Sequence, residues 1–257
     1  MAVGSERKYH VGLAAGEVGA YVLMPGDPGR TALIAAHLEG AREVAFNREY
    51  RTFTGRLERT PVSTTSSGIG GPSVAIAVEE LSDLGVHTFL RVGTCGALQP
   101  GIRRGDLVVA RGAVRDEGTP AGYVPLQYPA IADHEVVAAC LEAARQEGAP
   151  CHAGIVRSVD ALYADLSPER LPRGEEIARE HRVWRQAGVV AQDMESSTLM
   201  VVASLKGLRA GTILLCVDEV GEGEIEHLEP SLMDRMLKVA AGAIRRLIEQ
   251  DRAAQGQ

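Results

Sequence analysis

The sequence is poor in aromatic residues, in closely spaced cysteines and in long hydrophobic runs. Phe, Trp and Tyr make up 4% of the 257 residues, so the core must be built mainly from aliphatic side chains. No apolar run approaches the ~18 residues of a membrane-spanning helix, and residues 1–8 carry charges without the apolar run of a signal peptide. No Cys-x-x-Cys pair occurs, which favours reduced thiols and a cytoplasmic protein.

The chain also lacks a surplus of basic residues. Lys and Arg number 27 against 34 Asp and Glu, which gives a net charge of −7. Proteins that bind nucleic acid usually carry a basic surplus, so we expect neither nucleic acid nor a membrane as partner. Hydrophobic residues reach 45%, which predicts a packed core. We expect residues 1–257 to form one domain, with about 1–8 and 251–257 flexible.

Apolar runs typical of buried strands alternate with segments of helical spacing. Strands are predicted at residues 21–24, 57–65 (a pair broken at Pro61), 89–92, 107–110, 152–159, 189–191 and 211–217. Helices are predicted at residues 28–38, 74–84, 134–145, 195–205 and 232–249, with a mobile flap and a polar helix within 166–185. This alternation predicts an α/β fold with a largely parallel sheet covered by helices.

Three glycine-rich turns are predicted directly after strands, at Gly26, at 68–71 and at 93–96. Ligands of such sheets bind beyond the carboxyl ends of the strands. After Gly26, Asp27 is a good N-cap and Pro28 a good first helical residue, with Arg30 one turn on. This segment suits either an anion site or an ordinary capped helix. The turn at 68–71 lacks the spacing of a dinucleotide-binding fingerprint.

Charged residues at strand and helix ends are further candidates. Arg91 lies near the end of a predicted buried strand, where its charge requires a carboxylate or a bound anion, and Thr94 follows. Glu195 opens a predicted helix, where the dipole stabilises it, and its oxygens also suit two vicinal hydroxyls. Asp218 follows a predicted strand and suits either a helix cap or a proton-donating acid.

Four motifs together resemble the nucleoside phosphorylase family that includes uridine phosphorylase and the hexameric purine nucleoside phosphorylases. They lie at 25–30 (PGDPGR), 67–73 (SGIGGPS), 89–97 (FLRVGTCGA) and 193–196 (DMES), in the family's order. The stretches at 9–13, 77–81 and 98–100 look closest to uridine phosphorylase. The resemblance implies one domain with a central mixed, largely parallel, partly barrel-like sheet flanked by helices.

The resemblance also implies roles for individual residues. Phosphate would be held by Gly26, Arg30, Arg91 and Thr94, and by Arg48 of a neighbouring subunit. The ribose would contact Thr94, Met194 and Glu195, with His10 closing the 5′ side from the neighbour. The base would contact Cys95, Gly96, Leu162, Arg170, Asp193 and Asp218, and the catalytic residues would be Arg91, Arg170 and Asp218. A structural K⁺ between subunits would lie at Glu49, Ile69 and Ser73.

The base site departs from the uridine phosphorylase pattern. The Gln-x-Arg pair that recognises uracil there corresponds here to residues 167–170, where Arg170 is the candidate for the arginine and Pro168 replaces the glutamine. The expected glutamate before Met194 is Asp193, and Leu162 replaces an aromatic residue. Asp218 meanwhile aligns roughly with the acid that protonates purine N7. Pyrimidine and purine therefore both remain open.

The resemblance implies phosphorolysis of a ribonucleoside to a base and ribose 1-phosphate, most consistent with a uridine phosphorylase. A purine nucleoside phosphorylase that uses Asp218 is the alternative. A nucleosidase is less consistent with the arginines, and a non-catalytic nucleoside sensor is less consistent with the arginines together with Glu195. A dinucleotide-binding oxidoreductase is disfavoured by the missing fingerprint. We expect phosphate as co-substrate, no required cofactor, and a dimer that assembles further into a trimer of dimers, with active sites shared between subunits.

Overall fold

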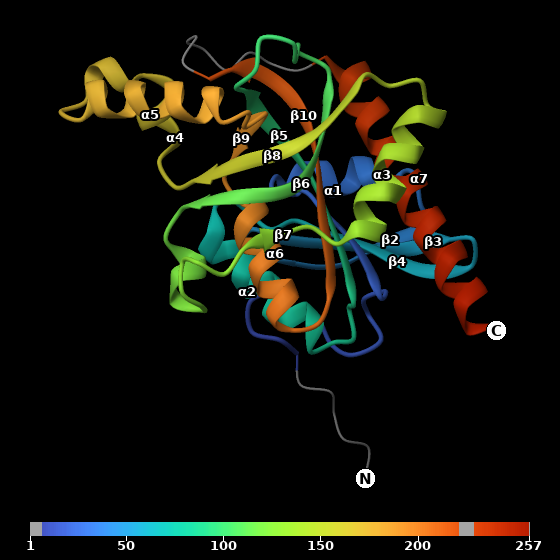
Figure 1. Cartoon of the computed structure of the whole chain (residues 1–257). Helices are drawn as coiled ribbons and strands as arrows, with labels where there is room; N and C mark the ends of the chain where they lie inside the picture. The colour runs from blue at the N-terminus through green and yellow to red at the C-terminus, as the bar shows by residue number, and fades with distance from the viewer. Residues whose placement is uncertain (1–6, 221–228, 257) are drawn as a thin grey trace.

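The structure is a computed structural model that describes residues 7–220 and 229–256. Within these residues, ten strands form one sheet in the order β10-β6-β8-β9-β5-β1-β4-β3-β2, with β7 beside β6 (Figure 1). The strands are β1 (Tyr21–Met24), β2 (Glu39–Asn47), β3 (Tyr50–Leu57), β4 (Thr60–Thr65), β5 (Thr88–Ala97), β6 (Leu107–Asp116), β7 (Ala130–Ile131), β8 (Cys151–Val159), β9 (Ala191–Asp193) and β10 (Arg209–Glu219). The helices are α1 (Pro28–Ala35), α2 (Gly71–Ser82), α3 (His134–Gln146), α4 (Leu162–Leu166), α5 (Gly174–Gln186), α6 (Ser196–Leu205) and α7 (Pro230–Gln255), with 3-10 turns η1 (Thr119–Gly122) and η2 (Pro168–Arg170).

Part of the sheet closes into a barrel. β5 pairs with β10 as well as with β9, so that β5, β10, β6, β8 and β9 form a closed ring of five strands. β4, β1, β5 and β10 are parallel in succession, and antiparallel pairings join β10 to β6 and β9 to β5. The prediction of an α/β fold with a mixed, partly barrel-like sheet is confirmed. Because β1, β5 and β10 run in one direction, their carboxyl ends meet at one edge.

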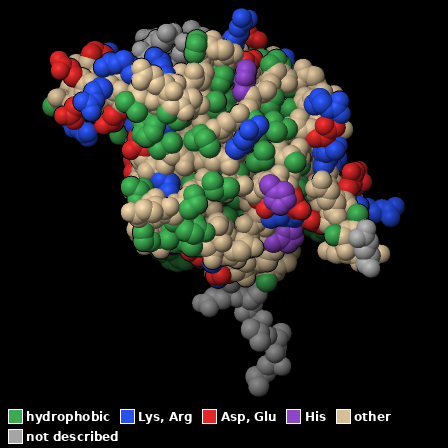
Figure 2. Space-filling view, viewed as in Figure 1, with side chains coloured by type: hydrophobic (Ala, Val, Ile, Leu, Met, Phe, Trp, Pro, Cys, Tyr) green, Lys and Arg blue, Asp and Glu red, His purple; other side chains and the backbone are tan. Residues whose placement is uncertain are grey.

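Helices cover the sheet in two groups. Side chains of α1, α3 and α7 share one hydrophobic cluster, which includes Ile34, Cys140 and Ile244. Side chains of α2 and α6 share another, which includes Val78 and Leu199. Figure 1 shows α3 beside α7 and α2 beside α6, while α5 projects from the body. Lys, Arg, Asp and Glu side chains crowd on this projection in Figure 2, as expected for the predicted polar helix.

The predicted turn at 93–96 is wrong, because these residues belong to β5. The strand continues to Ala97, with Gly93 opposite Leu214 on β10 and Gly96 opposite Gln192 on β9. Pairing with β10 along the whole segment, and with β9 at Gly96, holds it extended despite its two glycines. The functional residues at 91–96 therefore lie along a rigid strand rather than on a loop.

Several element boundaries also differ from expectation. β2 was not predicted, because most of its side chains are exposed or half-buried and show no apolar alternation. α1 ends at Ala35, and α7 continues past Glu249 to Gln255. The segment predicted as a flap and a polar helix contains η2 and most of α5, and α4 ends where it begins. Residues 1–6 and 257 lie outside the described residues, and the flexibility expected at both ends stays a prediction. No helix in the described part is long and apolar enough to cross a membrane.

Candidate active site

A cavity of about 680 Å³ opens where β1, β5 and β10 end. Its wall combines the segment after β1, the second half of β5, the end of β10, α4, and the junction of β9 with α6. Convergence of parallel strand ends is the expected place for a ligand in such a sheet. Fourteen of the seventeen predicted site residues line the cavity: Gly26, Arg30, Glu49, Ile69, Ser73, Arg91, Thr94, Cys95, Gly96, Leu162, Asp193, Met194, Glu195 and Asp218.

Arg91 forms the centre of the cavity's polar end. Its side chain is 6% exposed, with Nε 3.0 Å from Asp193 Oδ2 and Nη2 paired with Glu195 Oε2. Burial alone would lower the pKa of Arg91, but Glu195 and Asp193 raise it above its ordinary value, so the guanidinium stays charged. Nη1 is buried and has no hydrogen-bond acceptor among the described residues. An unpaired buried donor of this kind calls for a ligand acceptor.

Gly93 makes room for this guanidinium. A Cβ at Gly93 would lie 2.7 Å from Arg91 Nη2 and 2.9 Å from Leu214 Cδ2. Any larger residue would therefore displace the arginine from its carboxylate partners. Residue 93 lies in a strand and not in the predicted turn. The close approach of Arg91, and not a turn, therefore requires glycine here.

Asp193 and Glu195 hold the arginine in different ways. Asp193 accepts from Ser158 Oγ at 2.8 Å and Ser196 Oγ at 2.6 Å, in addition to Arg91, so its oxygens already have partners. Glu195 Oε1 accepts from the Gly70 N–H at 2.7 Å. Burial raises the pKa of Glu195, and Arg91 opposes that rise. Asp193 thus fixes the position of Arg91, while Glu195 faces the cavity at the start of α6.

The segment after β1 adds a second cation. Asp27 caps α1 by accepting from the Gly29 N–H at 2.8 Å, and Pro28 is the first helical residue, as predicted. Arg30 lines the cavity, and burial lowers its pKa, with Arg91 acting in the same direction. The two guanidinium groups are therefore close enough to interact, and both face one cavity. Such an arrangement suits a multivalent anion.

The opposite end of the cavity is mainly apolar. Leu162 and the neutral thiol of Cys95 line it; a hydrogen bond with Cys216, together with burial, raises the pKa of Cys95 well above its ordinary value. Burial also raises the pKa of Asp218, which Arg104 partly opposes. A carboxyl group with a raised pKa at such a place can donate a proton. Five other residues of this wall were not predicted from the sequence: Val159, Leu166, Gln192, Val217 and Val220.

Three predicted residues do not line the cavity. Arg170 lies in η2 with its side chain 80% exposed, beside Glu169. The His10 imidazole contacts Glu80 Oε1 at 2.6 Å, and Arg48 lies 5.8 Å from the centre of the Tyr9 ring. His10 and Arg48 both contact Tyr9, whereas none of the three residues lines the cavity with Arg91.

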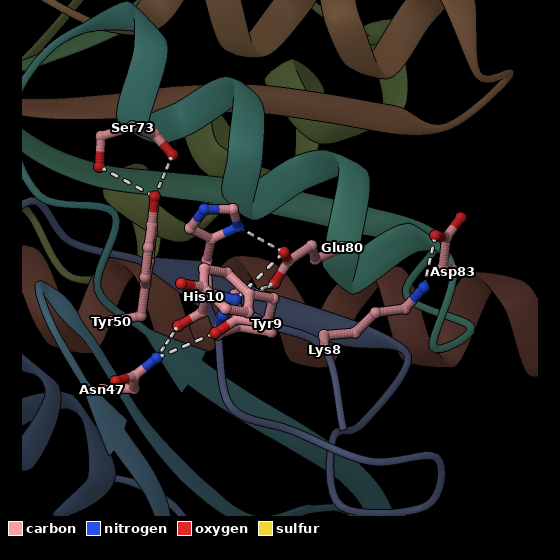
Figure 3. A network of polar contacts seen from close by, with 9 residues as sticks. Lys8, Tyr9, His10, Asn47, Tyr50, Ser73, Glu80 and Asp83 are labelled. Carbon is pink, nitrogen blue, oxygen red and sulfur yellow. Dashed lines mark hydrogen bonds and ion pairs between the residues drawn. The ribbon is translucent and has the colours of Figure 1, made fainter. Parts of the chain in front are cut away.

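The surroundings of His10 are well ordered by hydrogen bonds (Figure 3). Asn47 Nδ2 donates to the carbonyls of Tyr9 at 3.1 Å and His10 at 2.8 Å, while the Glu80 carboxylate accepts the His10 and Val11 N–H groups. The segment that carries His10 is therefore fixed to α2 and to the end of β2. It presents an exposed Tyr9 on the protein surface.

The predicted cation residues lie on the rim of the cavity. Ser73 Oγ is 3.1 Å from Glu49 Oε1. Tyr50 Oη donates to the Ser73 carbonyl at 3.0 Å (Figure 3). The Ile69 side chain is exposed. A carboxylate, a hydroxyl and a backbone carbonyl are hard oxygen donors, which is the kind of ligand that alkali and alkaline-earth cations prefer.

Comparisons with known proteins show the family of the chain. The family model described as "Phosphorylase superfamily" matches residues 20–250. The chain belongs to this superfamily. A phosphorylase relative, the uridine phosphorylase of Treponema pallidum, is 42% identical over 247 residues, which cover 95% of each chain. The uridine phosphorylase of Thermococcus kodakarensis is 48% identical over 80% of this chain and 75% of its own. The guanosine phosphorylase of Halorubrum lacusprofundi is 41% identical over 79% of this chain and 80% of its own.

Proposed function

We propose that the protein catalyses phosphorolysis of a ribonucleoside, with uridine as its substrate. An oxygen of hydrogen phosphate attacks C1′ of the ribose, the C1′–N bond breaks, and its electron pair leaves with the base. The base then takes up the proton that the phosphate loses as it becomes ribose 1-phosphate. The products are ribose 1-phosphate and the free base. The observation that carries the proposal is the buried Nη1 of Arg91. It lies on the guanidinium that pairs with Glu195, and it has no described acceptor, so it suits a bound anion.

Phosphate is the co-substrate, and no organic cofactor is part of the proposal. Arg30 and Arg91 attract it, while Thr94 and the backbone at Gly26 supply further donors. At an effective dielectric near 20, each guanidinium at ~4 Å attracts a unit negative charge by roughly 4 kcal/mol before desolvation. Much of the rate gain would come from holding phosphate in line below C1′.

The remaining cavity residues hold the nucleoside. Glu195 accepts hydrogen bonds from the ribose hydroxyls, and Met194 packs against the sugar. Cys95, Gly96 and Leu162 surround the base. For Asp193 we propose a supporting role, because its oxygens already bind Arg91, Ser158 and Ser196.

A purine nucleoside is the second candidate substrate. The raised pKa of Asp218 favours the protonated acid that would donate to purine N7. The similarity to a guanosine phosphorylase supports the same alternative. The uridine proposal instead assigns Arg170 to the departing uracil, and this role requires the exposed η2 segment to close over the cavity.

We further propose a cytoplasmic enzyme whose active site is shared between two subunits, arranged as a trimer of dimers. Arg30 and Arg91 face five carboxyl groups in the cavity lining: Asp27, Glu49, Asp193, Glu195 and Asp218. Since phosphate is a dianion, a third cation from outside the chain is needed, and Arg48 of a neighbour would supply it. His10 would close the 5′ side in the same way, and Glu49, Ile69 and Ser73 would hold K⁺ where the subunits meet.

One panel tests the proposed function. Uridine, thymidine, inosine and adenosine are each incubated with the enzyme, with and without phosphate, and free base and ribose 1-phosphate are measured. We expect base release from uridine only with phosphate, in equal amount to the sugar phosphate. Release that needs no phosphate would indicate a nucleosidase, and no release from any nucleoside would indicate a sensor.

A further inference from the structure

Gln192 lines the cavity and has no role in the reaction described above. On β9 it lies directly opposite Gly96 of β5, and on the other side Gly96 lies opposite Asp218 of β10. Residues opposite each other on neighbouring strands point to the same face of a sheet. All three residues line the cavity. Gln192 and Asp218 therefore flank Gly96 in one row.

The row leaves space for a flat ring. Neighbouring strands lie about 4.8 Å apart, so the backbones of Gln192 and Asp218 are separated by roughly 10 Å. A Cβ at Gly96 would lie 2.8 Å from Asp218 Oδ1, so only the bare backbone of a glycine fits between them. The nonpolar side chains of Leu162 and Leu166 line the same cavity. A heterocyclic base above Gly96 would thus have one polar side chain at each edge.

The orientation of the Gln192 amide is fixed by Arg157. Arg157 Nη1 lies 2.8 Å from Gln192 Oε1 and 2.9 Å from Asp165 Oδ1, and its Nε lies 2.6 Å from Asp116 Oδ2. A guanidinium only donates hydrogen bonds, so the amide oxygen must face it. Asp165 is itself held by His181 Nε2 at 2.5 Å, so this buried network has little freedom to turn.

The other amide atom is consequently left for a ligand. No described residue accepts a hydrogen bond from Gln192 Nε2, while Gln192 lines the cavity. Nε2 carries two N–H donors and no lone pair that can accept a hydrogen bond. The cavity therefore offers a fixed donor at the edge of the base opposite Asp218.

From this geometry we propose that Gln192 is a specificity-determining residue, which donates from Nε2 to an oxo group of the base. The proposal rests on the proposed function and narrows its substrates to nucleosides of oxo bases: uracil, hypoxanthine or guanine. Cytosine and adenine carry an amino group at the corresponding edge, which would face the Nε2 donor and leave both groups unpaired. We expect kcat/KM to favour the oxo base by at least about tenfold.

Matched pairs of nucleosides test the proposal on the wild-type enzyme. Uridine is compared with cytidine, and inosine with adenosine, all at saturating phosphate. We expect the oxo member to be preferred by at least about tenfold in whichever pair is cleaved. Equal kcat/KM within the cleaved pair would overturn the role of Gln192.

Variants then identify the residue responsible. Gln192→Glu keeps the shape of the side chain and replaces the donor by an acceptor, so the oxo-to-amino ratio should fall about tenfold or more. Gln186→Glu makes the same chemical change at the exposed end of α5 and should keep the wild-type ratio. If Gln192→Glu does not fold, as judged by circular dichroism, Gln192→Met serves in its place. A wild-type ratio in a folded Gln192 variant would contradict the proposal.

Failure of the proposed function can be told apart from failure of this inference. If the wild-type enzyme cleaves no nucleoside, calorimetry of uracil against cytosine and of hypoxanthine against adenine replaces the kinetic ratio. Tighter binding of the oxo bases, lost in the folded Gln192 variant, supports the inference without any turnover. Equal binding of the paired bases, or no binding of any base, contradicts it.

Discussion

Arg91 both contacts the carboxylates of the site and offers a donor to an anion. Two of its nitrogens are held by Asp193 and Glu195, and the third has no described acceptor. The same carboxylates that keep it charged also reduce its attraction for phosphate. The residue can therefore orient an anion, but it needs the help of other cations to bind one.

Replacement of the planar guanidinium should impair phosphate use without unfolding the protein. Arg91→Lys keeps the buried positive charge and loses the forked geometry that suits carboxylate and phosphate together. We expect kcat/KM for phosphate to fall by about 10² or more. Arg145→Lys, at an exposed pair with Glu142, is the matched control and should be unchanged. Wild-type phosphate kinetics in Arg91→Lys would rule out the assigned role.

Asp218 should act on purines through its proton. Because burial raises its pKa, the carboxyl group is more protonated near neutral pH than an exposed aspartate. Purine turnover that depends on this acid should decline as pH rises through the raised pKa. Asp218→Asn cannot donate this proton, so kcat for inosine should fall by about 10² while kcat for uridine changes far less. Equal losses on both nucleosides, in pH–rate profiles of the two enzymes, would remove the acid assignment.

The sequence predicted the polar end of the site better than the base end. A charge in a buried strand marks Arg91, and the carboxylate at a helix start marks Glu195, because both features depend on local sequence. Arg170 was assigned from the family resemblance, and a sequence match cannot say which way an exposed segment turns. Gln192 was not predicted. Its neighbour Arg157 is a charged residue within a predicted strand, as Arg91 is, and this feature could have pointed to the region.

At the scale of elements, β5 shows why glycine content misleads. Residues 93–96 suggest a turn, but pairing with β9 and β10 keeps them extended. β2 was missed for a different reason. It is an edge strand with no buried side chain, so its sequence shows no alternation of apolar and polar residues. Strands and helices with a clear buried face, such as residues 21–24 and 134–146, were predicted closely.

Hydrogen bonds join the last turns of α7 to the sheet in the described part. Arg209 of β10 contacts both Asp251 oxygens, at 2.8 and 2.5 Å, and Tyr21 of β1 donates to Asp251 Oδ2. The hydrogen bonds from Arg209 lower the pKa of Asp251, and burial opposes this. Its contribution to stability is therefore present above the ordinary aspartate pKa and lost as pH falls through the lowered value.

Neutralising this carboxylate should destabilise the fold. We expect Asp251→Asn to lower the free energy of unfolding by about 1–3 kcal/mol at pH 7. Glu249→Gln, at an exposed position of the same helix, should have no such effect. Urea unfolding of both variants at pH 7 and near pH 3 measures the difference, which should shrink at the lower pH. A stable Asp251→Asn variant would mean that the end of α7 contributes nothing to the fold.

At the scale of the whole molecule, the charge of the cavity is the central constraint. Two arginines face five carboxyl groups in one described chain, which is a poor place for a phosphate dianion alone. Arg48 lies outside this cavity, next to Tyr9 on the surface. A second subunit that brings Arg48 to the cavity would correct the balance and explain why His10 lies on the same surface.

Complementation between variants tests this shared site most directly. Arg48→Ala and Arg91→Lys are each purified, assayed for phosphorolysis, and then unfolded and refolded together. In a mixed assembly, one site inherits both defects while another has both wild-type residues. We predict that each variant alone is nearly inactive and that the mixture regains a substantial part of wild-type activity. Full activity of Arg48→Ala alone, or a mixture no more active than its parts, would contradict the account.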